Sequence, residues 1–201
     1  IFSSSAAVYG NVKFTDSIKE DVKYRPINAY GKSKLSCEKY LLKSKLKYCI
    51  FRYFNVVGKH LEKSIQKKKN FNLFEKLAYC IKYKLYLYIH GKNHNTKDGT
   101  PIRDYIHIDD IVSAHLECIN NRKNVFWNNI YNIGYNSGFT VMEIVNACNR
   151  LLSKKIRVKY VERNKGIITK SIANNNKLIQ NSNWKPKKYS INKFVRYFFL
   201  K

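Results

Sequence analysis

The side chains in this sequence best suited to chemistry are Tyr30 and Lys34, which lie four positions apart in Tyr-Gly-Lys-Ser-Lys. If a helix begins at Tyr30, the two share one face, so the phenol and the ammonium can project toward the same point. A nearby cation favours the phenolate form, which would let Tyr30 act as an acid or base near neutral pH. Ser5, at the end of an expected strand, can donate a second hydrogen bond to a reacting oxygen. These three residues are the candidate catalytic group.

Each of these residues also has an ordinary interpretation. In a chain so rich in lysine and tyrosine, most Tyr/Lys pairs at this spacing lie on solvated helix faces. Ser5 alone is a strand-end hydroxyl and Asn55 alone a turn residue. Arg103 next to Asp104 is by default a surface ion pair, and we interpret His107 as structural. A functional role is favoured only because other motifs occur with these residues along the chain.

The sequence contains four such motifs. In chain order they are Phe2-Ser-Ser-Ser-Ala-Ala-Val-Tyr-Gly10, Tyr30-Gly-Lys-Ser-Lys34, Arg52-Tyr-Phe-Asn55 and Arg103-Asp-Tyr-Ile-His107. Their order and approximate spacing resemble the extended short-chain dehydrogenase/reductase superfamily and, within it, the UDP-glucose 4-epimerases. The likeness runs from Ile1 to about Trp184. Four ordered motifs are much harder to meet by chance than one.

The resemblance implies an NAD-dependent isomerase that interconverts UDP-glucose and UDP-galactose in galactose metabolism, through a 4-keto sugar. It makes Tyr30 the catalytic base, Lys34 the residue that holds the nicotinamide ribose, and Ser5 the donor to the sugar's 4-oxygen. Ser5, Tyr30, Lys34 and Phe54 then form the cofactor side. The substrate side comprises Ser5, Tyr53, Asn55, Asn72, Leu73, Tyr88, His90, Arg103, Arg163 and Asn164. Arg103 would pair with the diphosphate, which its forked donors suit.

The sequence departs from the family in the loop before the last helices. Where the family has an arginine and an aspartate that bind the nucleotide, this chain has Asn164 and Ile167. Either Arg163 and Lys165 substitute for them or nucleotide affinity is reduced. Ser171 falls where the family has a residue whose size limits the sugar's C2 substituent. A small side chain there would admit N-acetylated sugars such as UDP-GlcNAc.

A second departure concerns the cofactor. No Gly-x-x-Gly-x-x-Gly turn follows any expected strand, so the helix N-terminus that would bind the cofactor's phosphates is not found in this sequence. The chain begins with Ile1 inside an expected strand. We therefore expect it to be the C-terminal part of a longer protein, and expect these 201 residues alone to be inactive and to hold NAD poorly.

Of two alternatives, one is disfavoured by particular residues and the other stays open. The related sugar-nucleotide dehydratases have Thr-Asp-Glu after the first strand, which supplies the acid and base for elimination; here the same places hold Ser5, Ala6 and Ala7. Elimination is therefore disfavoured. The rival from another class is a degenerate or truncated relative without activity, whose basic surface binds polyanions.

Composition sets the remaining limits. The formal net charge of +26 would ordinarily suggest nucleic acid or an anionic membrane as partner, but the lysines are scattered and accompany many Asn, Ile and Tyr residues. We favour a compositional bias and expect neither partner. The five cysteines are isolated, with no zinc-ligand or disulfide spacing, which predicts no metal site and a reducing compartment, the cytoplasm. The family further suggests a homodimer.

The hydrophobic pattern predicts an α/β fold. It combines the C-terminal part of a Rossmann-like parallel sheet, residues 1–56, with a smaller mixed lobe over 57–201 that returns segments to the sheet. Expected strands are 1–9, 48–55, 85–89, 103–106, 130–134 and 156–161. Expected helices are 30–45, 72–84, one from Asp109 or Asp110 to about 120, 140–152, 174–181 and 190–200. Residues 10–29, 59–70, 91–101 and 162–173 are expected to be loops.

Overall fold

The computed structural model describes residues 1–12, 16–58, 71–121, 125–162 and 168–200. The chain divides into two compact units. The first unit contains 1–56, 103–138 and 170–188, and the second contains 57–102, 139–169 and 189–201. The chain thus leaves the first unit and returns to it twice. That the first unit serves as the cofactor domain stays a prediction.

The first unit is built on a parallel sheet with the strand order β1-β2-β7. β1 spans Phe2–Ser5, β2 Cys49–Tyr53 and β7 Asn129–Ile133. Ser5 is level with Tyr53, and Tyr53 is level with Ile133. The middle strand is apolar and almost wholly buried, as expected for a parallel sheet covered on two faces. Because all three strands run the same way, their carboxyl ends meet at one edge.

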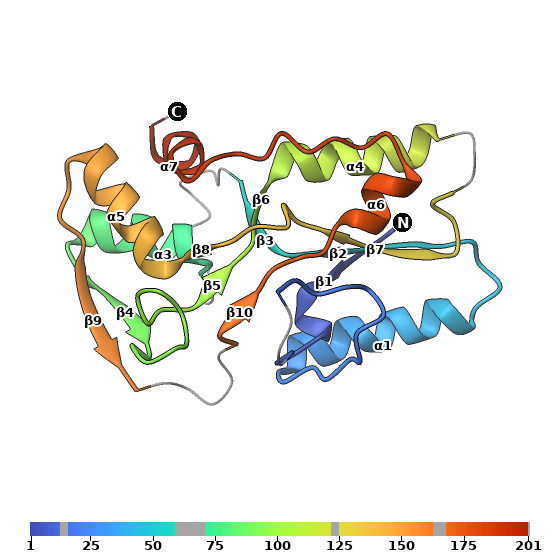
Figure 1. Ribbon diagram of the computed structural model, residues 1–201, viewed down its shortest axis with the longest axis horizontal. Coiled ribbons are helices and arrows are strands. Elements are labelled where there is room, and N and C mark those ends of the chain that lie inside the picture. The colour runs from blue at the N-terminus through green and yellow to red at the C-terminus, as the bar shows by residue number, and fades with distance from the viewer. Residues whose placement is uncertain (13–15, 59–70, 122–124, 163–167, 201) are drawn as a thin grey trace. The chain divides into compact units, whose positions relative to one another are not determined.

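Helices α1 (Ala29–Lys43) and α4 (Ile108–Asn120) cover opposite faces of this sheet (Figure 1). Successive side chains of β2 point to opposite faces. Arg52 accordingly contacts Glu38 of α1, whereas its neighbour Tyr53 contacts His115 of α4. The short helix α6 (Asn176–Asn181) packs beside β7, and the 3₁₀ turn η1 (Ala6–Val8) follows β1.

Two expected strands are each interrupted by one residue. Instead of a continuous 48–55, β2 ends at Tyr53 and β3 (Asn55–Val57) begins after Phe54, whose side chain is buried in a cluster with Val8 and Tyr9. Instead of 103–106, β5 (Ile102–Arg103) and β6 (Tyr105–His107) flank Asp104. The main chain of Asp104 bonds to Ser171 and Asn55, so it leaves the regular ladder.

The start of α4 also corrects the sequence prediction. Neither Asp109 nor Asp110 is the N-cap, because His107 takes that position and its Nδ1 accepts the N–H of Asp109 at 3.1 Å. Asp110 is buried inside the first turn and accepts the backbone N–H of Lys187 at 3.0 Å. Its carboxylate serves a tertiary contact, which leaves the cap to His107. The interpretation of His107 as structural agrees with this geometry.

The second unit contains a parallel pair of strands, β4 (Tyr86–His90) and β9 (Arg157–Val161). Its helices are α3 (Leu73–Tyr83), α5 (Val141–Leu152) and α7 (Ile191–Phe199). Phe74 of α3 packs against Phe194, Phe198 and Phe199 of α7. The expected Thr140/Glu143 capping box begins α5, and Asn72 with Glu75 forms another at α3.

The remaining short strands are β8 (Phe139–Thr140) and β10 (Lys170–Ser171), the latter within a segment expected to be irregular. The predicted loop 59–70 lies outside the described residues. Among the helices that the structure describes, none is both long and apolar enough to cross a bilayer.

Candidate functional site

Tyr30 and Lys34 lie on one face of the first turns of α1, as their spacing predicted. The Lys34 ammonium nitrogen is 5.7 Å from the centre of the Tyr30 ring and 5.2 Å from that of Phe2. It also donates to the main-chain oxygen of Ser3 at 2.9 Å, which anchors the lysine to β1. Tyr30 is 55% exposed. The pair combines an accessible phenol with a fixed cation.

Gly31 explains how the start of α1 comes so close to the end of β1. A Cβ added there would lie 2.5 Å from the carbonyl oxygen of Ala7 and 3.0 Å from Cβ of Pro26. Only glycine permits this approach of helix to backbone. Asn28 fixes the helix start, because its side-chain oxygen accepts the N–H of Gly31 at 2.7 Å. Tyr30 is therefore held against the segment that directly follows Ser5.

Ser5 ends β1 and caps η1. Its hydroxyl oxygen accepts the backbone N–H of Ala7 at 3.2 Å. A hydroxyl that accepts in this way can still donate its own proton. Ser5 can therefore serve the predicted role of donor to a reacting oxygen while it shapes the turn.

A buried ion pair that sequence reasoning missed lies beneath α1. Arg52 Nη2 and Glu38 Oε2 are 2.6 Å apart, and both side chains are fully buried. The Arg52 guanidinium also donates to the hydroxyl of Tyr9 at 2.9 Å and faces the ring of Tyr24. Burial alone would lower the pKa of Arg52, but the hydrogen bond to Glu38 and the charges around it raise the pKa. Ser4 donates to the same carboxylate.

This ion pair ties α1 to the sheet one turn after Lys34. The sequence held two signals for this pair. Glu38 lies four residues after Lys34, on the same helix face, and Arg52 is a charged residue within an otherwise apolar expected strand. Replacing one partner would leave the other charge buried and unpaired. The pair therefore fixes where α1 lies against the strands.

Tyr53 is placed on the opposite face of the sheet. Its hydroxyl lies 2.9 Å from Nε2 of His115 and 2.8 Å from the hydroxyl of Ser3. His115 Nδ1 lies 2.9 Å from the carbonyl of Ile111, so Nδ1 carries the proton and Nε2 accepts from Tyr53. Burial raises the pKa of Tyr53, which keeps its hydroxyl protonated. Its contact with a substrate stays a prediction.

Asn55 is linked to Arg103 through Asp104, the residue that directly follows Arg103. The backbone N–H and the side-chain Nδ2 of Asn55 both donate to the main-chain oxygen of Asp104, each at 3.0 Å. Burial lowers the pKa of Arg103, but an arginine stays charged throughout the physiological range. Phe54 is buried in the core, so a cofactor contact from its side chain stays a prediction.

The second unit holds the other predicted substrate residues. Tyr88 and His90 are exposed on one face of β4, where Arg157 and Lys159 lie opposite Tyr86 and Tyr88 on β9. The side chain of Asn72 is engaged as the N-cap of α3, and Leu73 is the first residue of that helix. Arg163, Asn164 and Ile167 lie outside the described residues.

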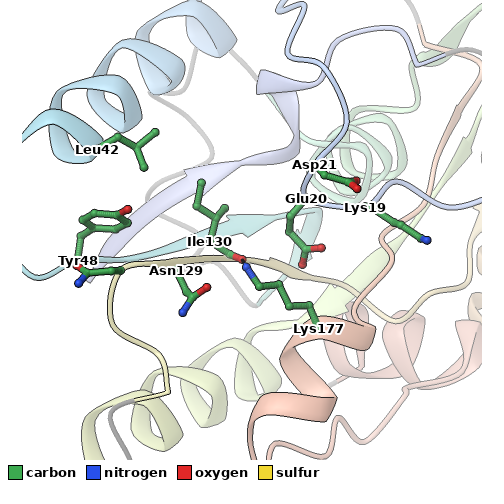
Figure 2. A pocket seen from close by; sticks show the side chains of 9 residues that line it. Lys19, Glu20, Asp21, Leu42, Tyr48, Asn129, Ile130 and Lys177 are labelled. Carbon is green, nitrogen blue, oxygen red and sulfur yellow. Dashed lines mark hydrogen bonds between the residues drawn. The ribbon is translucent and has the colours of Figure 1, made fainter.

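The first unit also has a hollow of about 440 Å³ that none of the predicted site residues lines (Figure 2). Lys19, Glu20 and Lys177 face it from the loop after β1 and from α6. Glu20 has a structural task there, because its carboxylate accepts the backbone N–H of Asn132 on β7 at 2.8 Å. Burial raises the pKa of Glu20. This hollow lies by the amino-terminal ends of β2 and β7, whereas α/β sheets bind ligands at the carboxyl ends.

Comparison with known proteins identifies the family of the chain. Residues 1–134 match the NAD dependent epimerase/dehydratase family. The UDP-glucose 4-epimerase of Streptococcus mutans is 32% identical over 97% of this chain and 60% of its own length. This chain thus spans about 60% of the length of that relative.

Solved structures give the same result. A UDP-glucose-4-epimerase from Stenotrophomonas maltophila, with bound NAD and formylated UDP-arabinopyranose, superposes with a TM-score of 0.87 at 27% identity, covering 99% of this chain and 61% of that one. The UDP-Glc/GlcNAc 4-epimerase of Campylobacter jejuni superposes with a TM-score of 0.77 at 33% identity, covering 98% of this chain and 62% of that one.

Proposed function

Because the chain belongs to the NAD dependent epimerase/dehydratase family, we propose that its gene product is a UDP-sugar 4-epimerase that interconverts UDP-glucose and UDP-galactose. The observation that carries the proposal is the juxtaposition on α1. An exposed Tyr30 and a fixed Lys34 share one helix face, and Gly31 brings that face against the segment after Ser5. A base, a cation and a hydroxyl donor together fit the removal and return of a hydroxyl proton.

The side chains divide the work as follows. Tyr30 accepts the proton of the sugar's 4-hydroxyl, with the Lys34 ammonium on the same helix face. Ser5 donates to the same oxygen as it becomes a carbonyl. Bound NAD would supply the reversible acceptor for the hydride at C4. The 4-keto sugar turns over before the hydride returns, so the hydride reaches the opposite face of C4. Tyr30 gives its proton back to the 4-oxygen, and no net oxidation occurs.

The residues present fit only the nicotinamide side of NAD. Tyr30 lies in the helix turn that packs against Ala7, just past the carboxyl end of β1, the edge of a parallel sheet where such cofactors bind. Lys34 extends from the same helix face to the main chain of Ser3. Lys34 would hold the ribose hydroxyls and Phe54 would border the nicotinamide. The glycine-rich turn for the phosphates is not found in these 201 residues. Activity is therefore proposed for the complete gene product.

For the nucleotide sugar we propose Arg103 as partner of the diphosphate, with Tyr53 and Asn55 on the sugar side. Asn72, Leu73, Tyr88, His90, Arg163 and Asn164 would complete the nucleotide side. We further propose that the enzyme works as a cytoplasmic homodimer in galactose metabolism.

A second candidate substrate is UDP-GlcNAc, which Ser171 favours. Ser171 is small and buried at β10, at the position that resemblance identifies with the limit on the C2 substituent. The Ser171→Tyr variant should lose UDP-GlcNAc epimerisation and keep that of UDP-galactose. Unchanged activity on both sugars would refute the role of Ser171.

The proposal is tested by supplying UDP-galactose and NAD to the complete gene product and following UDP-glucose by NMR. Tyr30→Phe should reduce turnover by several orders of magnitude. Tyr40→Phe is the matched control, because Tyr40 lies on the same helix and is 74% exposed. No conversion with NAD bound would point to another sugar. No NAD binding would favour the degenerate relative.

A further inference from the structure

Asp104 directly follows the predicted substrate residue Arg103 and bonds to another, Asn55, yet the proposed chemistry gives it no role. It separates β5 from β6, directly after Arg103, and its side chain is fully buried. The default interpretation of the sequence, which the motifs had already set aside for Arg103, was a surface ion pair between the two residues. The structure instead surrounds its carboxylate with backbone.

Backbone N–H groups from two distant segments donate to this carboxylate. Tyr135 donates at 2.9 Å to Oδ1, while Asn136 and Ala173 each donate at 3.1 Å to Oδ2. Asn136 has a φ of 56°, the left-handed conformation that turns successive N–H groups toward one anion. Charged acceptors make the stronger hydrogen bonds. The carboxylate therefore joins the turn after β7 to the segment after β10.

Gly134 shows how closely these segments approach. A Cβ at Gly134 would lie 2.7 Å from Oδ2 of Asp104 and 2.5 Å from Cβ of Ala173. The turn can wrap around the carboxylate only because this residue has no side chain. The arrangement is thus a tight backbone cradle built for one carboxylate.

The main chain of the same residue holds the substrate side of the proposed site. Its carbonyl oxygen accepts two bonds from Asn55, and its N–H donates to the carbonyl of Ser171 at 2.9 Å. Arg103 precedes it directly in the chain. A movement of Asp104 would therefore move Asn55, Arg103 and Ser171 together.

We propose that Asp104 is a positioning residue for the nucleotide sugar, acting through Asn55 and Arg103 while its carboxylate is fixed by the cradle. This inference rests on the proposed function. It predicts that the loss of the carboxylate weakens sugar-nucleotide binding more than it slows the chemistry at Tyr30, which lies on another element. A residue that only stabilised the fold would alter both alike.

The test uses the complete gene product with NAD at pH 8.5. Asp104→Asn keeps the size but places an amide NH₂ against N–H donors. The KM for UDP-galactose and the Kd measured by calorimetry should rise about tenfold, the loss of about one hydrogen bond, with kcat changed less than about threefold. Asp21→Asn, the same change at an exposed position in the same unit, should leave both constants unchanged.

A double-variant cycle identifies the route. In an Asn55→Ala background, Asp104→Asn should raise KM much less than it does alone, because one residue it acts through is already gone. Equal factors in both backgrounds, or an equal fall in kcat and rise in KM with a lowered melting temperature, would overturn the positioning role.

A milder pair keeps the test valid if Asp104→Asn does not fold. Asn136 is exposed and lies in the left-handed region, so Asn136→Ala strains the cradle whereas Asn136→Gly does not. KM should rise a few-fold in the first variant only, and identical KM values would overturn the proposal. If the unaltered protein turns over UDP-galactose but none of these variants changes its KM, the positioning role alone is refuted. An unaltered protein that binds no UDP-sugar refutes the proposed function and the inference with it.

Discussion

The Arg52–Glu38 pair of the first unit and the Lys97–Glu143 pair of the second show two different uses of charge. In the first, Arg52 and Glu38 form a fully buried pair beneath α1, and Asp104 is enclosed by backbone. In the second, Lys97 pairs with Glu143 at the surface, and Arg157 lies over the exposed ring of Tyr86. Surface pairs contribute little to stability, whereas breaking a buried pair is costly. The comparison indicates that buried charges in the first unit hold the elements carrying the proposed catalytic residues.

The sharpest way to break this comparison is Arg52→Met. The variant leaves Glu38 buried without its partner, so the free energy of unfolding in urea should fall by about 3–5 kcal/mol. Lys97→Met in the second unit should change it by less than about 1 kcal/mol. Replacing Arg52 and Glu38 together by Met should recover much of the loss. Similar effects of the two single variants would contradict the difference between the units.

The enclosed carboxylate predicts a pH dependence of stability. Burial raises the pKa of Asp104 to about 7, although bonds from backbone N–H groups lower it. Between its ordinary value of 3.8 and about 7 the folded protein therefore holds a proton that the unfolded chain has released. This contribution to stability is fully present below about pH 4 and is lost as the pH rises through 7.

The loss should amount to at most roughly 4 kcal/mol, at 1.36 kcal/mol per pH unit. The Asp104→Asn variant should lack this slope in urea unfolding measured from pH 4 to 8. If the two proteins keep parallel profiles, Asp104 does not titrate near 7.

Gly31→Ala should act on the catalytic helix directly. The added Cβ lies 2.5 Å from the carbonyl oxygen of Ala7, so α1 must shift away from the segment after Ser5. We expect a loss of about 1–3 kcal/mol in unfolding free energy and a lower kcat, since Tyr30 moves with the helix. Ser36→Ala, at an exposed position of α1, is the control. Normal kcat in Gly31→Ala would show that this close approach does not position Tyr30.

The smallest expected effect lies in the second unit. Thr140→Ala removes the N-cap of α5, whose side chain accepts the N–H of Glu143 at 3.0 Å. Because the same hydroxyl also donates to the Asp98 carboxylate, the unfolding free energy should fall by about 1–2 kcal/mol. The kcat should not change, because Thr140 belongs to none of the elements that hold Tyr30. A large fall in kcat would mean that the second unit also positions the base.

Local signals in the sequence were sufficient for most elements. The Tyr30 helix was predicted at 30–45 and is found at Ala29–Lys43, and the capping box at Thr140 is confirmed. Period and caps are local properties, which explains this success. The family followed from four ordered motifs and the α/β fold from the hydrophobic pattern, and both are confirmed by comparison.

What the sequence did not reveal depends on contacts between distant residues. Asp104 interrupts a strand because its main chain bonds to Asn55 and Ser171, and its carboxylate meets N–H groups 31 to 69 positions away. The cap of α4 shifted to His107 because Asp110 is committed to Lys187. Glu38 and Arg52 each looked ordinary in isolation. No local pattern specifies such partners, although an arginine inside an apolar strand was a usable signal.

The central claim is that Tyr30 serves an internal exchange of hydride at C4, and isotope retention tests it most directly. UDP-galactose carrying deuterium at C4 is converted by the complete gene product, and the UDP-glucose is analysed by NMR and mass spectrometry. We predict that the deuterium stays at C4 and that Tyr30→Phe abolishes conversion. Product that has exchanged its C4 deuterium with solvent, or undiminished conversion by Tyr30→Phe, would contradict the claim.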